Sequence, residues 1–290
     1  MAANQKEKDR RSSQAKDVIY RLVKNKAAMV GLAIIVILIL CAIFADYIAP
    51  YGFDDQELSR RFTKPCKEFP FGTDNFGRCI FSRIIYGTRI SLKVGLLSTS
   101  ISAIAGTFLG AIAGYYGKAV DNIIMRIVDI MLAIPGILLA ISIAAALGPG
   151  LVNAMIAISI GAIPGFARMV RASVLTVKEQ EYVEAAHSIG ASDLRIIFFH
   201  ILPNCFATII VQVTMGVAGA ILSTSSLSFI GLGISPPTPE WGAMLSAGRQ
   251  YIRDHGYIVL FPGLAIMTTI LALNLFGDGL RDALDPRLKT

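Results

Sequence analysis

A stretch of the chain between two apolar runs holds the residues whose types and spacing indicate a function most directly. The set consists of Glu184, Ala185, Ala186, Gly190, Leu202 and Pro203. The chemistry that these residues suit is noncovalent docking, because a carboxylate presented to water beside two small side chains leaves room for a close-fitting groove of another protein. We therefore expect a rigid, water-exposed element that binds a soluble partner.

The sequence around this set predicts the elements that must position it. Residues 177–189 are mostly good helix formers, and Gly190 suits the left-handed conformation that closes a helix. Ser192 and Asp193 can cap a second helix, which we expect Pro203 to end beside the next apolar run. The product is a helix, a short elbow and a second helix. A push on this arm must move the attached membrane helices as a body.

The composition places most of the chain in a membrane. Hydrophobic residues make up 54% of the sequence, charged residues only 16%, and the mean hydropathy is +0.62, which is far more apolar than a soluble domain needs. At about 1.5 Å per residue, runs long enough for roughly 30 Å of hydrocarbon occur at residues 27–45, 94–116, 130–147, 151–167, 205–222 and 257–277. We predict an all-α integral membrane protein with six transmembrane helices.

The Lys and Arg residues orient these helices. With a cytoplasmic N-terminus, most of the 27 Lys and Arg residues fall on inside segments, as the positive-inside rule requires. This topology explains the net charge of +7 without nucleic acid, for which no aromatic-interleaved basic patch is present. The expected parts are a cytoplasmic tail (1–26), an uncleaved transmembrane anchor (27–49), an extracytoplasmic segment (50–89), a five-helix core (90–280) with a cytoplasmic loop (168–204), and a cytoplasmic C-terminus (281–290).

Small residues and prolines predict how the helices pack. Gly106, Gly110 and Gly114 recur every four residues and place three positions without side chains on one helix face. Another backbone can approach closely there, so we predict helix packing at these glycines instead of contact with solute. Pro135 and Pro164 free backbone carbonyls inside the third and fourth runs and are expected to kink both helices.

Ionisable side chains are scarce in the apolar runs. Arg126 and Asp129 lie three residues apart at the start of the third run, where we expect a local ion pair at the cytoplasmic edge that sets the depth of the helix. The alternative, a proton or ion relay, needs acidic or basic residues deeper in the membrane, and runs 130–147, 151–167 and 205–222 contain none. This pattern argues against an ion-coupled pump.

The remaining reactive residue types form no catalytic or metal pattern. Cys66 and Cys79 fall in one external segment, where a disulfide is open to them in an oxidising compartment, and their spacing matches no metal motif. We interpret His187 and His200 as loop or interface residues. The chain has no G-x-x-x-x-G-K-[ST] loop, so we expect it neither to bind ATP nor to be an enzyme by itself.

The spacing from Glu184 to Leu202 resembles the EAA loop of ABC-importer permeases, whose form is EAA, three residues, Gly, nine residues, Ile, one residue and Leu. One departure is that the family isoleucine falls on His200, with Ile201 beside it. The resemblance extends over nearly the whole chain and narrows to the C-type permease subunits of dipeptide, oligopeptide and nickel importers. It is carried by residues 71–74, 77–78, 82–83, 87–92, 125–129, 200–204, 227–233 and 236–242. Where many relatives have Asp after Gly-Arg, this chain has Cys79, so a role of that acid does not carry over.

A proline-rich segment on the expected outer side is a second candidate for a protein contact. Pro236, Pro237 and Pro239 favour an extended backbone, and Trp241 favours the membrane interface. From composition alone, Pro236, Pro237, Glu240 and Trp241 either face a solute-delivering protein or line the bilayer. The resemblance favours the binding protein.

The resemblance implies a type I ABC-importer permease with a MetI-like core and an extra N-terminal anchor helix, in the cytoplasmic membrane. Its implied partners are a second homologous permease, two cytoplasmic ATPases that bind ATP and Mg²⁺, an extracytoplasmic substrate-binding protein and lipid, with no cofactor or metal in this chain. Closure of the ATPase pair would move the Glu184 loop and turn the membrane cavity outward. Short peptides are the expected solute, and nickel, glutathione and oligosaccharides stay open.

Two hypotheses from other classes of protein compete with the interpretation as an importer permease. A self-sufficient secondary transporter predicts ionisable residues inside the membrane and an internal repeat, neither of which is clear in the sequence. A membrane enzyme or a structural scaffold is the third hypothesis. It predicts either a cluster of polar residues at one depth in the membrane or the absence of a cytoplasmic docking loop.

Overall fold

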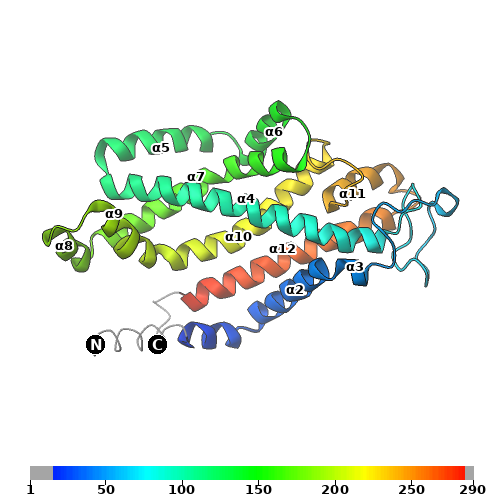
Figure 1. The fold of residues 1–290 in the computed structure, drawn as a ribbon, viewed down its shortest axis with the longest axis horizontal. Coiled ribbons are helices and arrows are strands. Elements are labelled where there is room, and N and C mark those ends of the chain that lie inside the picture. Colours follow the sequence, from blue (N-terminus) through cyan, green and yellow to red (C-terminus); the bar gives the residue numbers. More distant parts are fainter. Residues whose placement is uncertain (1–15, 285–290) are drawn as a thin grey trace.

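The computed structural model describes residues 16–284 and has five long helices that run along the length of the molecule (Figure 1). These are α2 (Lys26–Ile43), α4 (Ile80–Tyr116), α7 (Leu151–Lys178), α10 (Leu202–Phe229) and α12 (Tyr257–Leu284). The shorter elements are α3 (Ala45–Ile48), η1 (Leu58–Arg60), α5 (Lys118–Leu132), α6 (Gly136–Leu147), α8 (Glu181–Ser188), α9 (Asp193–Ile196), η2 (Ile197–Ile201), α11 (Trp241–Gly248) and η3 (Arg249–Tyr251). Each long helix is apolar and long enough to cross a bilayer, which confirms the predicted all-α membrane fold.

The third expected span, 130–147, is not one continuous helix. Helix α5 ends at Leu132, and α6 begins at Gly136 with its axis bent by 86° from that of α5. Pro135 causes the break, because proline lacks an N–H and disfavours the helical conformation of the residue before it. With 12 residues, α6 is only about 18 Å long, so a sixth crossing exists only if the bent pair is taken as one span. Pro164, in contrast, lies inside α7, which continues through it.

Helices α4 and α7 have the most extensive contact of any helix pair within residues 16–284. A Cβ added to Gly106 would lie 2.4 Å from the Cβ atom of Phe166, and one added to Gly110 would lie 2.4 Å from the carbonyl oxygen of Ala167. At Gly114 the side chain of Val174 is 2.8 Å from the same added atom. The three glycines thus let the backbones of α4 and α7 touch, as their four-residue spacing predicts.

The N-terminal helix α2 lies against α12 through small residues. Ala28 and Gly31 are its buried positions, and a Cβ on Gly31 would meet the carbonyl oxygen of Ala272 at 2.6 Å. At the other end of α2, Arg89 donates from Nε to the carbonyl of Ala42 at 2.8 Å and pairs with Asp46 at 3.2 Å. A basic side chain that satisfies the last carbonyls of a helix stabilises its end, so Arg89 joins the anchor to the core.

Residues 49–79 fold over the first turns of α4. Arg78 donates from Nε to Asp74 at 2.7 Å, and Arg83 donates from Nη1 to the carbonyl of Phe53 at 2.7 Å. Helix α4 begins at Ile80, so the last part of the expected segment 50–89 is helical. Cys66 is an exposed free thiol and Cys79 a buried one.

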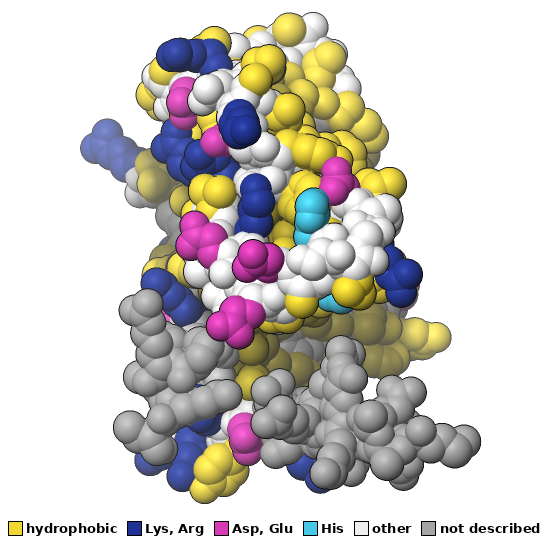
Figure 2. All heavy atoms as spheres, turned by 90° about the vertical axis from the view of Figure 1, so that its left-hand side faces the viewer, with side chains coloured by type: hydrophobic (Ala, Val, Ile, Leu, Met, Phe, Trp, Pro, Cys, Tyr) yellow, Lys and Arg dark blue, Asp and Glu magenta, His cyan; other side chains and the backbone are white. Residues whose placement is uncertain are grey.

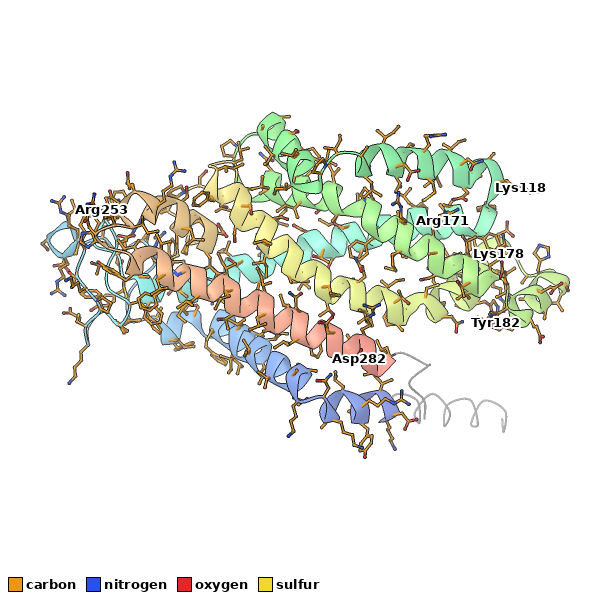
Figure 3. The ribbon with its side chains drawn as sticks, turned by 180° about the vertical axis from the view of Figure 1, so that it is seen from behind. Lys118, Arg171, Lys178, Tyr182, Arg253 and Asp282 are labelled. Carbon is orange, nitrogen blue, oxygen red and sulfur yellow. The ribbon has the colours of Figure 1, made fainter. Side chains whose placement is uncertain are left out.

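The two ends of the molecule differ. The start of α2, the end of α12 and α8 lie at the same end, whereas residues 49–79 and α11 lie at the other (Figure 1). From behind, Lys178 and Tyr182 likewise mark one end and Arg253 the other (Figure 3).

Candidate functional site

The candidate site is the arm formed by α8, the following elbow and α9, at the end of the molecule that faces the viewer in Figure 2. Val183 and Ala186, three residues apart on α8, are buried in a cluster that includes Val170 and Val174 of α7. Glu184 and Ala185 are exposed on the opposite face. Ala186 therefore corrects the sequence interpretation, because it packs against the body and only Ala185 is left to fit a partner's groove.

The elbow ends α8 with a Schellman motif. The N–H of Gly190 donates to the carbonyl of His187 at 3.0 Å, and the N–H of Ala191 donates to that of Ala186 at 3.1 Å. Gly190 has φ +78°, in the left-handed region, and a Cβ added there would meet nothing within 4 Å. The predicted role of Gly190 in closing the helix is confirmed, and the reason is backbone conformation and not crowding.

Polar contacts tie the arm to the end of α4. The Tyr115 hydroxyl donates to Asp193 at 2.8 Å, and the Lys178 ammonium donates to the carbonyl of Tyr115. Between these residues and α8 lies a cavity of about 580 Å³ that Glu184 and His187 also line. Displacement of α8 must therefore be felt by both α4 and α7. Tyr115 and Lys178 were not singled out from sequence, and Asp193 was expected only to cap a helix, because the contacts of all three join distant segments.

Tyr182 lies on α8 beside the buried thiol of Cys205. Desolvation by partial burial raises the pKa of the Tyr182 hydroxyl above its ordinary value. The Tyr182 hydroxyl is therefore neutral at physiological pH.

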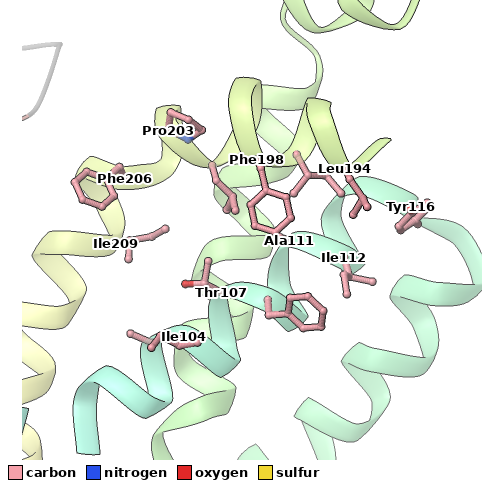
Figure 4. A pocket seen from close by; sticks show the side chains of 14 residues that line it. Ile104, Thr107, Ala111, Ile112, Tyr116, Leu194, Phe198, Pro203, Phe206 and Ile209 are labelled. Carbon is pink, nitrogen blue, oxygen red and sulfur yellow. The ribbon is translucent and has the colours of Figure 1, made fainter. Parts of the chain in front are cut away.

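Leu202 and Pro203 lie apart from the Glu184 face. They line an apolar groove of about 740 Å³ between α4 and the start of α10, together with Phe198 and Phe206 (Figure 4). The groove consists of membrane-type side chains, so the structure separates the Leu-Pro pair from the exposed part of the arm.

The prediction that Pro203 ends a helix is wrong. It lies in the first turn of α10, which continues from α9 through the π-helical turn η2. In that turn the N–H of Leu202 bonds the carbonyl of Ile197, and the Asn204 amide donates to that of His200 at 2.7 Å. The wider turn accommodates the proline ring, which would clash in a regular α-helix.

Two exposed apolar side chains extend the surface of the arm. Ile189, beside the elbow, is 85% exposed, and Leu194 of α9 is 65% exposed. Leu194 also lines the apolar groove, so Ile189 is the apolar side chain that the arm itself leaves open beside Glu184 and Ala185. The signal in the sequence is the isoleucine directly before Gly190, within an otherwise polar stretch.

Helix α5 is bound to α7 by ion pairs that sequence reasoning missed. Asp129 pairs with Arg168 at 2.5 Å, and Asp121 accepts two hydrogen bonds from Arg171, each of 2.5 Å. The expected local pair of Asp129 with Arg126 is therefore wrong, because the acid reaches across to the neighbouring helix. The pairs fix α5 along α7 just before the 86° bend.

The proline-rich segment contributes less external surface than predicted. Pro236 and Pro237 are exposed, and the peptide bond between them is cis. Glu240 and Trp241 are both 0% exposed, so neither can touch a binding protein or a membrane interface. Glu240 caps α11 by accepting hydrogen bonds from Gly242 and Ala243, and the Trp241 indole donates to the carbonyl of Ile84 at 3.1 Å. Their role is to hold α11 against α4.

The fold has a solved counterpart. A structure of the MetNI methionine ABC transporter, in an inward-facing conformation, matches with a TM-score of 0.58 and 18% identity over 71% of this chain and 98% of that chain. The bundle and its arm thus define the class, a MetI-like permease fold with an added N-terminal helix.

The chain belongs to the family of binding-protein-dependent transport system inner membrane components, whose model matches residues 106–290. Residues 13–65 match the N-terminal transmembrane domain of oligopeptide transport permease C. The chain is accordingly a multi-pass inner-membrane protein and a transport permease.

Several relatives span nearly its whole length. A dipeptide transport system permease protein of Alkalihalophilus pseudofirmus is 52% identical over 95% of this chain and 90% of its own. A di/tripeptide transport system permease protein of Pseudomonas aeruginosa is 46% identical over 96% and 93%. A glutathione transport system permease protein of Pectobacterium atrosepticum is 45% identical over 93% and 90%.

Proposed function

We propose that this chain is the permease subunit of an ABC importer that moves short peptides across the cytoplasmic membrane. The observation that carries the proposal is the arm, whose buried face is fixed to α4 and α7 while Glu184, Ala185 and Ile189 remain open to a partner. The names of the full-length relatives support short peptides, and one relative transports glutathione, itself a tripeptide.

The partners follow from what the arm does. Two cytoplasmic ATPases bind ATP and Mg²⁺, and one of them receives α8 of this chain. A second permease completes the membrane pathway, and an extracytoplasmic binding protein delivers the peptide near Pro236 and Pro237. The chain itself is non-catalytic. We place both termini and α8 in the cytoplasm, an assignment supported by α8 and the end of α12 lying on the same side of the molecule, away from residues 49–79.

Coupling proceeds by rigid-body movement. When the ATPases close, α8 is displaced, and the displacement reaches α7 through the buried contacts of Val183 and α4 through the hydrogen bond of Asp193 with Tyr115. The connections on both sides of α8 are short: α7 ends at Lys178, α8 runs from Glu181 to Ser188, and α9 begins at Asp193. The inward-facing and outward-facing states are then selected by the ATPase state.

The test is uptake of a labelled dipeptide by proteoliposomes that contain the complete importer. Glu184→Arg reverses one exposed charge on the arm, and Asp17→Arg makes the same change at an exposed position outside it. We expect at least a tenfold loss of uptake and of ATPase co-purification with Glu184→Arg, and wild-type behaviour with Asp17→Arg. Equal behaviour of both variants would count against docking through this face.

Competition defines the solute. An excess of unlabelled di- or tripeptide should block uptake, while Ni²⁺ and oligosaccharide should not. Inhibition by glutathione as strong as that by dipeptides would extend the solute range to that tripeptide.

A further inference from the structure

A cavity of about 360 Å³ lies between α4, α6, α7 and α10, away from the arm and from the apolar groove. Its volume is within the range of small-molecule sites. Its walls include Ser98 and Thr99 of α4 and Gln212 and Ser223 of α10, and no lining side chain is charged. A cavity in a permease that offers hydrogen bonds but no charged side chain suits polar solutes whose net charge varies from one to the next.

Three of the five glycines in the cavity wall lack a packing reason, whereas a Cβ added to Gly216 would lie 2.8 Å from Cγ2 of Thr99. A Cβ added to Gly136, Gly165 or Gly219 would meet nothing within 4 Å, in contrast to the 2.4 Å contacts at Gly106 and Gly110. Glycine inside a helix is destabilising relative to alanine, so a glycine that faces open space needs another explanation. From three helices, these glycines keep the cavity wide and leave backbone accessible to an occupant.

The hydroxyl of Thr99 is a second, independent observation. Thr99 is 2% exposed, lines the cavity and has no hydrogen-bond partner for its Oγ1 atom among residues 16–284. The neighbouring Ser102 bonds the carbonyls of Ser98 and Ser159 at 2.8 and 2.9 Å, so this part of α4 otherwise satisfies its hydroxyls. A buried hydroxyl without a partner is costly unless something else supplies one.

We propose that this cavity is a segment of the translocation path that holds the backbone of a short peptide. Thr99 and Gln212 hydrogen-bond to the amide N–H and C=O groups of the peptide, and the glycines of α6, α7 and α10 leave room for its side chains. Backbone recognition without charged groups lets one path carry peptides of different sequence. This inference rests on the proposed import of peptides and adds the place in the chain where the peptide passes.

The experiment fills the cavity without disturbing helix packing. Gly219→Leu and Gly165→Leu place a side chain in the open space, and Gly263→Leu on α12 is the matched control, because its nearest neighbour is an ordinary contact of 3.9 Å outside the cavity. Thr99→Val removes only the hydroxyl and keeps the shape. Each complete importer is purified, its subunit composition is determined, and uptake of a labelled dipeptide and peptide-stimulated ATPase activity are measured in proteoliposomes.

We expect Gly219→Leu and Gly165→Leu to assemble and to hydrolyse ATP while uptake falls at least tenfold, Thr99→Val to lower uptake severalfold, and Gly263→Leu to stay within twofold of wild type. Uptake at the wild-type rate by Gly219→Leu and Thr99→Val would overturn the inference and leave peptide import intact. Failure of the wild-type complex to take up any peptide would overturn both. If the leucine variants fail to assemble, Thr99→Val decides, since an unchanged uptake rate for this isosteric variant also overturns the inference.

Discussion

At the scale of single residues, Gly190 links one backbone angle to the shape of the arm. Its φ of +78° lets the chain turn from α8 into α9 while two hydrogen bonds close the helix. An L-residue pays about 1–2 kcal/mol for that conformation, and a β-branched one more than asparagine, which tolerates it. The shape of the elbow thus depends on the left-handed backbone conformation of Gly190, because a side chain at this position would meet no neighbouring atom.

Gly190→Val should weaken binding of the ATPase subunit about tenfold, because roughly 1.4 kcal/mol of strain corresponds to that factor. Gly190→Asn should stay within about threefold of wild type, since asparagine adopts the left-handed conformation more readily. Titration of the purified permease pair with ATPase measures both affinities. Equal losses for valine and asparagine would show that bulk, not conformation, matters at this position.

Trp241 stabilises the end of the molecule that contains α11 and residues 49–79. Trp241→Ala removes a fully buried side chain and its hydrogen bond to Ile84, and we expect a loss of about 3–5 kcal/mol. Ser235→Ala changes an exposed position in the same segment and should alter stability by no more than about 0.5 kcal/mol. Denaturation of the detergent-solubilised protein distinguishes the two; an unchanged midpoint for Trp241→Ala would contradict its structural role.

At the scale of elements, two prolines show what local sequence can and cannot predict. Pro135 was expected to kink a helix, and it separates α5 from α6 by 86°. Pro203 was expected to end a helix, yet it lies in the first turn of α10, because the wider π-helical turn directly before it accommodates the proline ring. A proline marks a place where the regular hydrogen bonding of a helix must change. The surrounding packing determines whether the helix breaks there or continues.

The bidentate pair of Asp121 and Arg171 should fix α5 on α7. Arg171→Asp leaves two acids facing each other at a partly buried site, and we expect a loss of about 1–3 kcal/mol of stability. The exchange of both residues, Asp121→Arg with Arg171→Asp, should recover part of that loss, with a coupling energy of about 0.5–3 kcal/mol. Thermal unfolding of the two single variants and the double variant measures it. Strict additivity would mean that the contact contributes nothing to holding α5.

At the scale of the whole molecule, the sequence predicted the features that depend on neighbouring residues in the chain. It did not predict contacts between residues on different helices. Apolar length predicted the long helices, and the spacing of Gly106, Gly110 and Gly114 predicted a face that meets another helix. The partner of Asp129 was missed because Arg168 lies on another helix. Trp241 was expected to contact a binding protein or the bilayer, because a tryptophan that fills a core has the same composition signal as one at a surface.

The orientation of the whole chain is tested by a native thiol and an engineered one. Cys66 is exposed among residues 49–79, whereas Cys79 and Cys205 are buried and Cys41 lies within the apolar helix α2, so Cys66 is the thiol that an impermeant maleimide should reach in sealed, right-side-out vesicles. Ser188 is exposed at the end of α8, on the opposite end of the molecule, and Ser188→Cys combined with Cys66→Ser moves the reactive thiol there. With the arm in the cytoplasm, this double variant should react in inverted vesicles only, while Cys66→Ser alone should react in neither. Labelling of Cys66 in inverted vesicles would reverse the topology and separate the arm from the cytoplasmic ATPases, because both thiols belong to one rigid bundle.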